Sequence, residues 1–242
     1  SRVSTFFQTT TVLISVPSVF ILTALLISLW GGSIRFTVPM LFAAAFIPMF
    51  GLGGLTGLPL AFSAIDLQLH DTYYVIGHFH YVVAPGTIFA LFAGIYHWYP
   101  KVTGRKMSEF WGKVHFWPSL LCMNGIFLPR VWQGRAGVHR RWYDGGGTVE
   151  SPTYELAKGV IHWNEFMTTS AFLLAVAQVP FIINVFASLW KGERVGDNPW
   201  EATTLEWATP TPPPHGNFSV PVEVHRGPYE YSVPGDRKST RL

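Results

Sequence analysis

The sequence predicts an all-α, polytopic membrane protein with five transmembrane helices. Hydrophobic residues make up 49% of the 242 residues, whereas charged residues make up only 13%, about half of the ~25% usual in soluble domains. The charges are also unevenly spaced. Several intervals without a charged residue approach or exceed the ~20 apolar residues that cross a hydrocarbon core. These observations disfavour the alternative, a large soluble helical core.

The five predicted spans occupy these charge-free intervals. Their ranges are about 9–30, 38–65, 72–99, 113–132 and 163–190. The second range contains several glycines and prolines, so we expect irregular backbone there, which at membrane depth must be buried in protein or line a cavity. The spans form a bundle over 1–194, and a Pro-rich tail over 195–242 is expected to be extended and disordered towards its end.

The basic residues predict the orientation of the chain. If the spans alternate in direction, one side carries a set of Lys and Arg residues in its loops or tail: Arg35, Lys101, Arg105, Lys106, Lys191 and Arg194. The positive-inside rule then places the C-terminus in the cytoplasm. The net charge of +3 is small, and no nucleic-acid partner is expected. The chain starts at Ser1 rather than Met, which suggests a fragment or a processed product.

Two histidines in the third span carry the chemistry. His78 and His80 stand at positions i and i+2, and such residues on an α-helix point about 200° apart. They cannot share one metal, but they can serve two cofactors on opposite faces of one helix. Neutral imidazole is a usual axial ligand of haem iron. The alternative is a pair of hydrogen-bonded structural histidines, although ionisable residues inside a span are costly and indicate function by default.

The surrounding residues resemble a known family. The string His70-Asp71-Thr72-Tyr73-Tyr74 followed by His78-Phe79-His80 is similar to the signature of cytochrome c oxidase subunit I, a member of the haem–copper oxidase superfamily. The GGLTG sequence at 53–57, the pair Arg140-Arg141 and the NPWEATTLEW sequence near the C-terminus are also similar to the family. The resemblance implies that the five spans are helices eight to twelve of a twelve-helix bundle.

The resemblance also implies roles for individual residues. His78 would be the catalytic ligand of a high-spin haem next to copper, and His80 would ligate a low-spin haem, both haems being a-type. Asp66, Arg140 and Arg141 would lie near the haem propionates. The alternative for the two arginines is a loop anchored to lipid headgroups.

The resemblance places a magnesium site at the outer face. Its ligands would be His70 and Asp71, with a further ligand from another subunit, since Mg²⁺ takes few carboxylates plus water. The copper ligands lie outside this chain. The implied partners are the N-terminal half of subunit I, the copper-carrying subunit II, subunit III, membrane lipid, and cytochrome c or a similar electron donor. The implied location is a bacterial inner membrane.

One departure concerns proton delivery. Familiar members of the family carry a Lys in the first span, and the matching position here is Ile21. The hydroxyl groups of this span cannot hold a proton against the cost of a buried charge. The favoured function is therefore an oxygen-reducing, proton-translocating oxidase whose protons arrive through the rest of the protein. The alternatives are a nitric oxide reductase, a non-catalytic haem-carrying subunit and an unrelated transporter.

Overall fold

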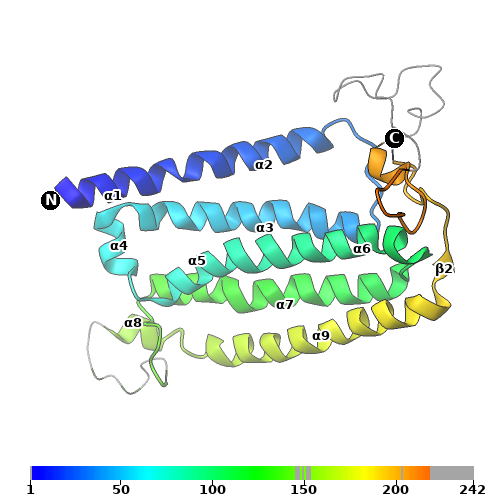
Figure 1. The fold of residues 1–242 in the computed structure, drawn as a ribbon. Helices are drawn as coiled ribbons and strands as arrows, with labels where there is room; N and C mark the ends of the chain where they lie inside the picture. The colour runs from blue at the N-terminus through cyan, green and yellow to red at the C-terminus, as the bar shows by residue number, and fades with distance from the viewer. Residues whose placement is uncertain (1, 145–147, 149, 151–153, 203, 219–242) are drawn as a thin grey trace.

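The chain forms a layer of long helices that lie side by side and alternate in direction (Figure 1). The computed structural model describes residues 2–144, 148, 150, 154–202 and 204–218. Its helices are α1 (Arg2–Leu13), α2 (Ser15–Leu29), α3 (Val38–Ala61), α4 (Ser63–Leu69), α5 (Tyr73–Val83), the π-helix η1 (Ala84–Phe89), α6 (Ala90–Thr103), α7 (Glu109–Arg135), α8 (Glu155–Lys158), α9 (Trp163–Lys191) and the 3₁₀-helix η3 (Leu205–Trp207). Two short strands, β1 (Arg105–Lys106) and β2 (Glu193–Arg194), pair antiparallel.

Four helical segments are long and apolar enough to cross a membrane: Arg2–Leu29, Val38–Ala61, Tyr73–Thr103 and Trp163–Lys191. This confirms a membrane protein of α-helices. The remaining predicted span, 113–132, falls on α7, which has 27 residues, a length of ~40 Å at the α-helical rise. It is less apolar than the other four and lies alongside α5 and α9.

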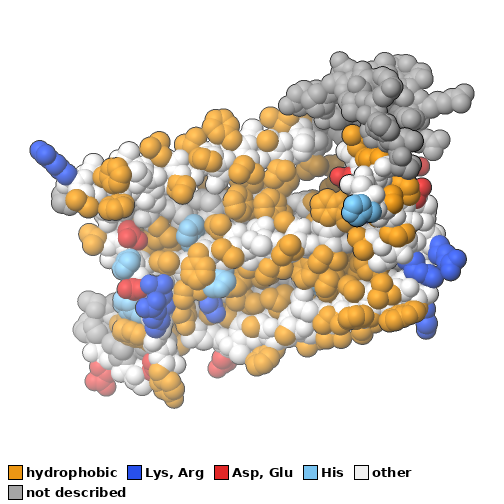
Figure 2. Space-filling view, in the orientation of Figure 1, with side chains coloured by type: hydrophobic (Ala, Val, Ile, Leu, Met, Phe, Trp, Pro, Cys, Tyr) orange, Lys and Arg blue, Asp and Glu red, His pale blue; other side chains and the backbone are white. Residues whose placement is uncertain are grey.

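The outer surface of this layer is hydrophobic. Figure 2 shows apolar side chains across the middle of the molecule, with Lys and Arg concentrated towards its two ends. None of the residues of α2 is buried, and on α9 Phe172 is 73% exposed and Trp190 is 71% exposed. Exposed apolar surface of this extent is typical of contact with lipid or with further helices.

The irregular backbone lies in a different span from the one expected. The second span remains helical through Gly51, Gly57 and Pro59 and ends only at Ala61. Its glycines allow close packing, because a Cβ on Gly53 would lie 3.0 Å from the backbone of Tyr81. The irregular segment is instead η1 in the third span, a π-helix that contains Pro85.

Local sequence signals explain where the central helices begin and end. Thr72 begins α5, because its hydroxyl accepts a hydrogen bond from the Tyr74 amide at 3.2 Å, which caps the helix. Ser108 begins α7 in the same way. Gly104 ends α6 in the left-handed conformation, at φ +68°, which costs glycine little.

The first part of the tail packs against the bundle and is not simply extended. Trp207, in η3, is only 2% exposed. The Lys101 ammonium donates hydrogen bonds to the carbonyl oxygens of Asp197 at 2.9 Å and Thr209 at 2.7 Å. The tail is thereby fixed to the end of α6. The predicted disorder of the tail end falls on 219–242, which lie outside the described residues.

Candidate functional site

The two histidines of α5 face different helices. His78 points to α3, where its Nδ1 lies 2.9 Å from the Gly53 carbonyl oxygen and 3.2 Å from the Thr56 hydroxyl. The contact is tight, because a Cβ on Gly57 would lie 2.6 Å from the His78 Cε1 atom. The glycine therefore provides the space that this imidazole occupies.

His80 points towards α7. Its imidazole stacks on the Phe127 ring, with the ring centroids 4.5 Å apart and the planes at 12°. Its Nδ1 lies 2.8 Å from the carbonyl oxygen of Ile76, one turn earlier in α5. The opposite placement of the two side chains agrees with the ~200° separation expected on an α-helix.

Both imidazoles have the hydrogen-bonding pattern of metal-ligating histidines. A backbone carbonyl can only accept, so in each ring Nδ1 carries the proton and donates it. The remaining nitrogen, Nε2, then has a free lone pair. Histidines that ligate a metal usually donate their other ring N–H to a carbonyl or carboxylate in this way. His78 and His80 therefore fit axial ligation of two separate haem irons.

The residues expected at the outer face gather where α4 meets α5. His70 Nδ1 lies 3.7 Å from an Asp66 carboxylate oxygen, and His70 Nε2 lies 3.5 Å from one of Asp71. Arg140 donates from Nε to Asp71 Oδ1 at 2.7 Å and forms an ion pair with the same carboxylate. Its backbone amide also donates to the Asp71 carbonyl oxygen at 2.9 Å. Arg141 is exposed beside this group.

Arg140 also sets the protonation of Asp71. The hydrogen bond from its guanidinium holds the pKa of the Asp71 carboxyl below its usual value, against a smaller opposing effect of desolvation. Asp71 is thus an anion at neutral pH. Within the described part of the chain, no group of three or more His, Cys, Asp or Glu side chains is arranged to hold a metal ion.

Sequence reasoning missed one charged residue near His80. Arg130 marks only the end of a charge-free interval in the sequence, but in the structure its guanidinium lies over the Phe127 ring, 5.8 Å from the centroid. Phe127 is the ring on which His80 stacks. The available signal was an arginine inside the predicted span 113–132, near its end.

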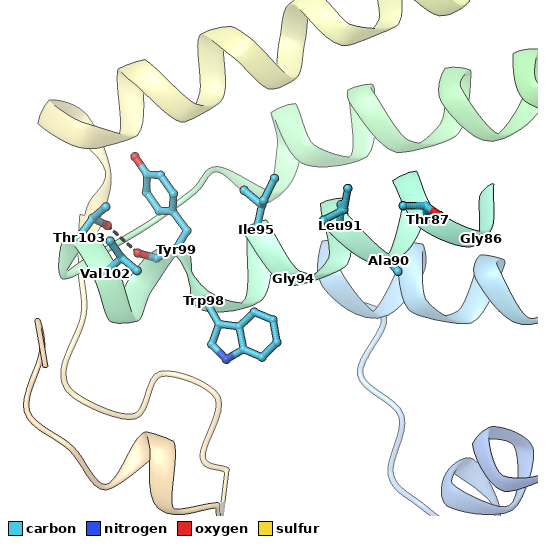
Figure 3. A pocket seen from close by; sticks show the side chains of 10 residues that line it. All are labelled: Gly86, Thr87, Ala90, Leu91, Gly94, Ile95, Trp98, Tyr99, Val102 and Thr103. Atoms are coloured by element: carbon cyan, nitrogen blue, oxygen red, sulfur yellow. Dashed lines mark hydrogen bonds between the residues drawn. The ribbon is translucent and has the colours of Figure 1, made fainter. Parts of the chain in front are cut away.

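The apolar groove along η1 and α6 lies apart from both histidines. Figure 3 shows its lining, which includes Thr87, Leu91, Ile95 and Trp98, and its volume is about 790 Å³. Neither imidazole contributes to this lining. The groove is therefore not the candidate haem-ligand site.

The model of the family "Cytochrome C and Quinol oxidase polypeptide I" matches residues 1–176 of this chain. The chain belongs to this family. It is 45% identical over 233 residues to an alternative cytochrome c oxidase subunit 1 of Bradyrhizobium diazoefficiens, covering 95% of this chain and 38% of the relative. It is 43% identical over 230 residues to cytochrome c oxidase subunit 1 of a Synechocystis species, covering 94% and 39%. The chain thus spans about two fifths of the length of these relatives.

The fold agrees with the family. A solved haem–copper terminal oxidase dimer is similar with a TM-score of 0.54 at 21% identity, over 64% of this chain and 27% of that one. The family match and the relatives confirm the resemblance to subunit I that the histidine signature indicated, and the chain is a partial subunit I region. Membership of this family implies haem cofactors and a complex with other subunits.

Proposed function

We propose that this oxidase polypeptide is the C-terminal part of the catalytic subunit of a respiratory terminal oxidase. The complete subunit would reduce oxygen to water with electrons from cytochrome c and couple the reaction to proton translocation. The names of its relatives support a cytochrome c oxidase. Bound haems would supply the electron transfer and the oxygen chemistry, with copper held by residues outside this chain.

The observation that carries the proposal is the pair of imidazoles on opposite faces of α5. His78, held against α3 by the Gly53 carbonyl, would ligate the high-spin haem iron through Nε2. His80, held by the Ile76 carbonyl, would ligate the low-spin haem iron through Nε2. Because both ligands lie on one rigid helix, α5 would fix the separation of the two irons.

The outer cluster supports a role in anchoring haem propionates and magnesium. Arg140 and Arg141 would contact the propionates, and Asp66 would lie in the same region. His70 and Asp71 would bind Mg²⁺ together with a ligand from another subunit. The lowered pKa of Asp71 favours this role, because a metal ligand must be deprotonated.

The complex would lie in a bacterial inner membrane with the C-terminus in the cytoplasm. Its other members would be the N-terminal half of subunit I, subunit II and subunit III. Protons would not enter through α1 and α2, where the position expected to hold Lys is Ile21. Hydroxyls of these helices bond to backbone carbonyls within the same helices, as Thr9 does at 2.9 Å and Ser28 at 2.6 Å.

The lack of a proton pathway through α1 and α2 keeps nitric oxide reduction as a second candidate function, since that reaction does not need proton pumping. Measuring oxygen and nitric oxide consumption by the purified complex separates the two. Rapid oxygen uptake with proton release to the outer side supports the oxidase. Nitric oxide consumption without proton translocation favours the reductase.

The haem assignments are tested by substituting each histidine in the complete complex. We expect His80→Asn to remove the low-spin haem spectrum and leave the high-spin haem, and His78→Asn to do the reverse. His162→Asn is the control, because His162 is exposed at the start of α9. Retention of both haem spectra in either site variant would show that the assigned ligand is wrong.

A further inference from the structure

Arg130 carries a positive charge on a partly buried side chain near the end of a helix of membrane-spanning length. It belongs to α7, five residues before the helix ends at Arg135. Its Nε atom is buried and has no hydrogen-bond partner. Placing a guanidinium inside a span is costly even near the end of the helix, and arginine cannot escape this cost by losing its proton.

The guanidinium contacts aromatic rings. Its central carbon lies 5.6 Å from the centroid of the Tyr73 ring and 5.8 Å from that of the Phe127 ring. Such cation–π contacts stabilise the charge but satisfy none of its N–H groups. In the part of the chain that the structure describes, no hydrogen bond or ion pair reaches this side chain. Its N–H groups are therefore free for an acceptor that the chain itself does not supply.

The position of Arg130 relates it to one histidine and not to the other. Phe127, three residues earlier on the same face of α7, stacks on the imidazole of His80 at 4.5 Å. Arg130 lies over this same Phe127 ring, 5.8 Å from its centroid, whereas His78 lies on the opposite face of α5 against α3. A second buried atom without a partner, Gln133 Oε1, lies one turn further along α7. Polar groups left unpaired near a candidate cofactor site indicate a missing ligand.

We propose that Arg130 is a haem-contacting residue that donates to an oxygen substituent at the edge of the porphyrin held by His80. The inference rests on the proposed role of His80 as a haem ligand. The acceptor is either a carboxylate or a carbonyl conjugated with the ring. A fixed positive charge there stabilises the reduced haem, which carries one more electron than the oxidised form, and so raises its midpoint potential.

The test compares Arg130→Gln with the parent in the complete oxidase complex, by spectroelectrochemical titration of both haems. We expect the ratio of reduced to oxidised low-spin haem at a fixed applied potential to fall about tenfold, equivalent to ~59 mV for one electron. The haem on His78 should change much less. Arg135→Gln removes the same charge from an exposed position on the same helix and should leave both potentials unchanged.

The reduced absorption band identifies the acceptor. A conjugated carbonyl predicts that the band of the low-spin haem also moves in Arg130→Gln, whereas a carboxylate predicts a change of potential without a change of band position. If the ratio of reduced to oxidised low-spin haem in Arg130→Gln stays within twofold of the parent value at the same applied potential, the inference is overturned.

A charge-conserving variant covers the case in which Arg130→Gln loses the haem. Arg130→Lys should keep the low-spin haem with a potential close to that of the parent. Loss of that haem from the Lys variant as well, with the other haem retained, would show that packing and not charge is required, and would overturn the inference. Failure of the His80 assignment is distinguishable, because the low-spin spectrum would then survive His80→Asn.

Discussion

Replacing Gly57 by alanine tests the packing that positions His78. The new Cβ would lie 2.6 Å from Cε1, 3.2 Å from Nε2 and 3.3 Å from Nδ1 of the His78 ring. The closest approach is roughly 0.8 Å short of the 3.4 Å at which ordinary contact begins. Either the imidazole rotates away from α3, or α3 and α5 separate by a similar distance.

The energies involved decide the expected result. Overpacking of this kind costs ~1–3 kcal/mol, and loss of the hydrogen bond from Nδ1 to Gly53 costs a further ~0.5–1.5 kcal/mol. The higher helix propensity of alanine stabilises the variant by only ~0.8–1.0 kcal/mol. We therefore expect Gly57→Ala to displace the imidazole and to reduce the content of high-spin haem, while the haem on His80 remains.

The assay is the reduced-minus-oxidised spectrum of the purified complex, with haem content measured against protein. Gly54→Ala is a matched control, because a Cβ on Gly54 would meet no atom within 4 Å. That variant should keep both haems. If Gly57→Ala retains a full high-spin haem spectrum, the close contact between α3 and His78 does not hold the imidazole in place, and the reasoning fails.

Three further substitutions test other parts of the structure. Arg140→Gln should let the pKa of Asp71 return towards its usual value. This pKa is lowered in the folded protein, so the stabilisation from the ion pair is present above the pKa of Asp71 in the unfolded chain and is lost as pH falls through its pKa in the folded protein. The melting temperature of the variant should therefore fall less than that of the parent when the pH is lowered through this range. Lys101→Met leaves two tail carbonyls unpaired, at ~1–3 kcal/mol each, and should speed proteolysis of the tail, whereas Lys113→Met, at an exposed site, should not. Gly134→Ala would place a Cβ 1.9 Å from the backbone of α5 and should prevent assembly of the complex, as measured by its yield after purification; normal yield would contradict the described contact.

Some features of the candidate site follow from the sequence because they depend on local geometry. The opposite placement of His78 and His80 needs only the 100° rotation per residue of an α-helix. The proximity of His70 and Asp71 follows from their adjacency in the chain. The confirmed prediction of a helical membrane protein depends on composition and on the length of the charge-free intervals, which are also local properties.

Other features could not be predicted because they depend on which helices meet. The glycines of the second span were expected to break the helix, but the helix continues through them and they make room for α5, with Gly57 facing His78. The ion pair between Asp71 and Arg140 joins residues that are far apart in the chain.

The sequence by itself therefore determined the class of protein, the family and the pair of imidazoles, since hydropathy, motif and helical rotation are properties of neighbouring residues. Only the tertiary structure decided that His78 faces α3, that His80 stacks on α7, and that the charge of Arg130 lies on the His80 side. The physical reason is that packing between helices fixes contacts over long sequence separations, and no local pattern encodes which side chains meet there.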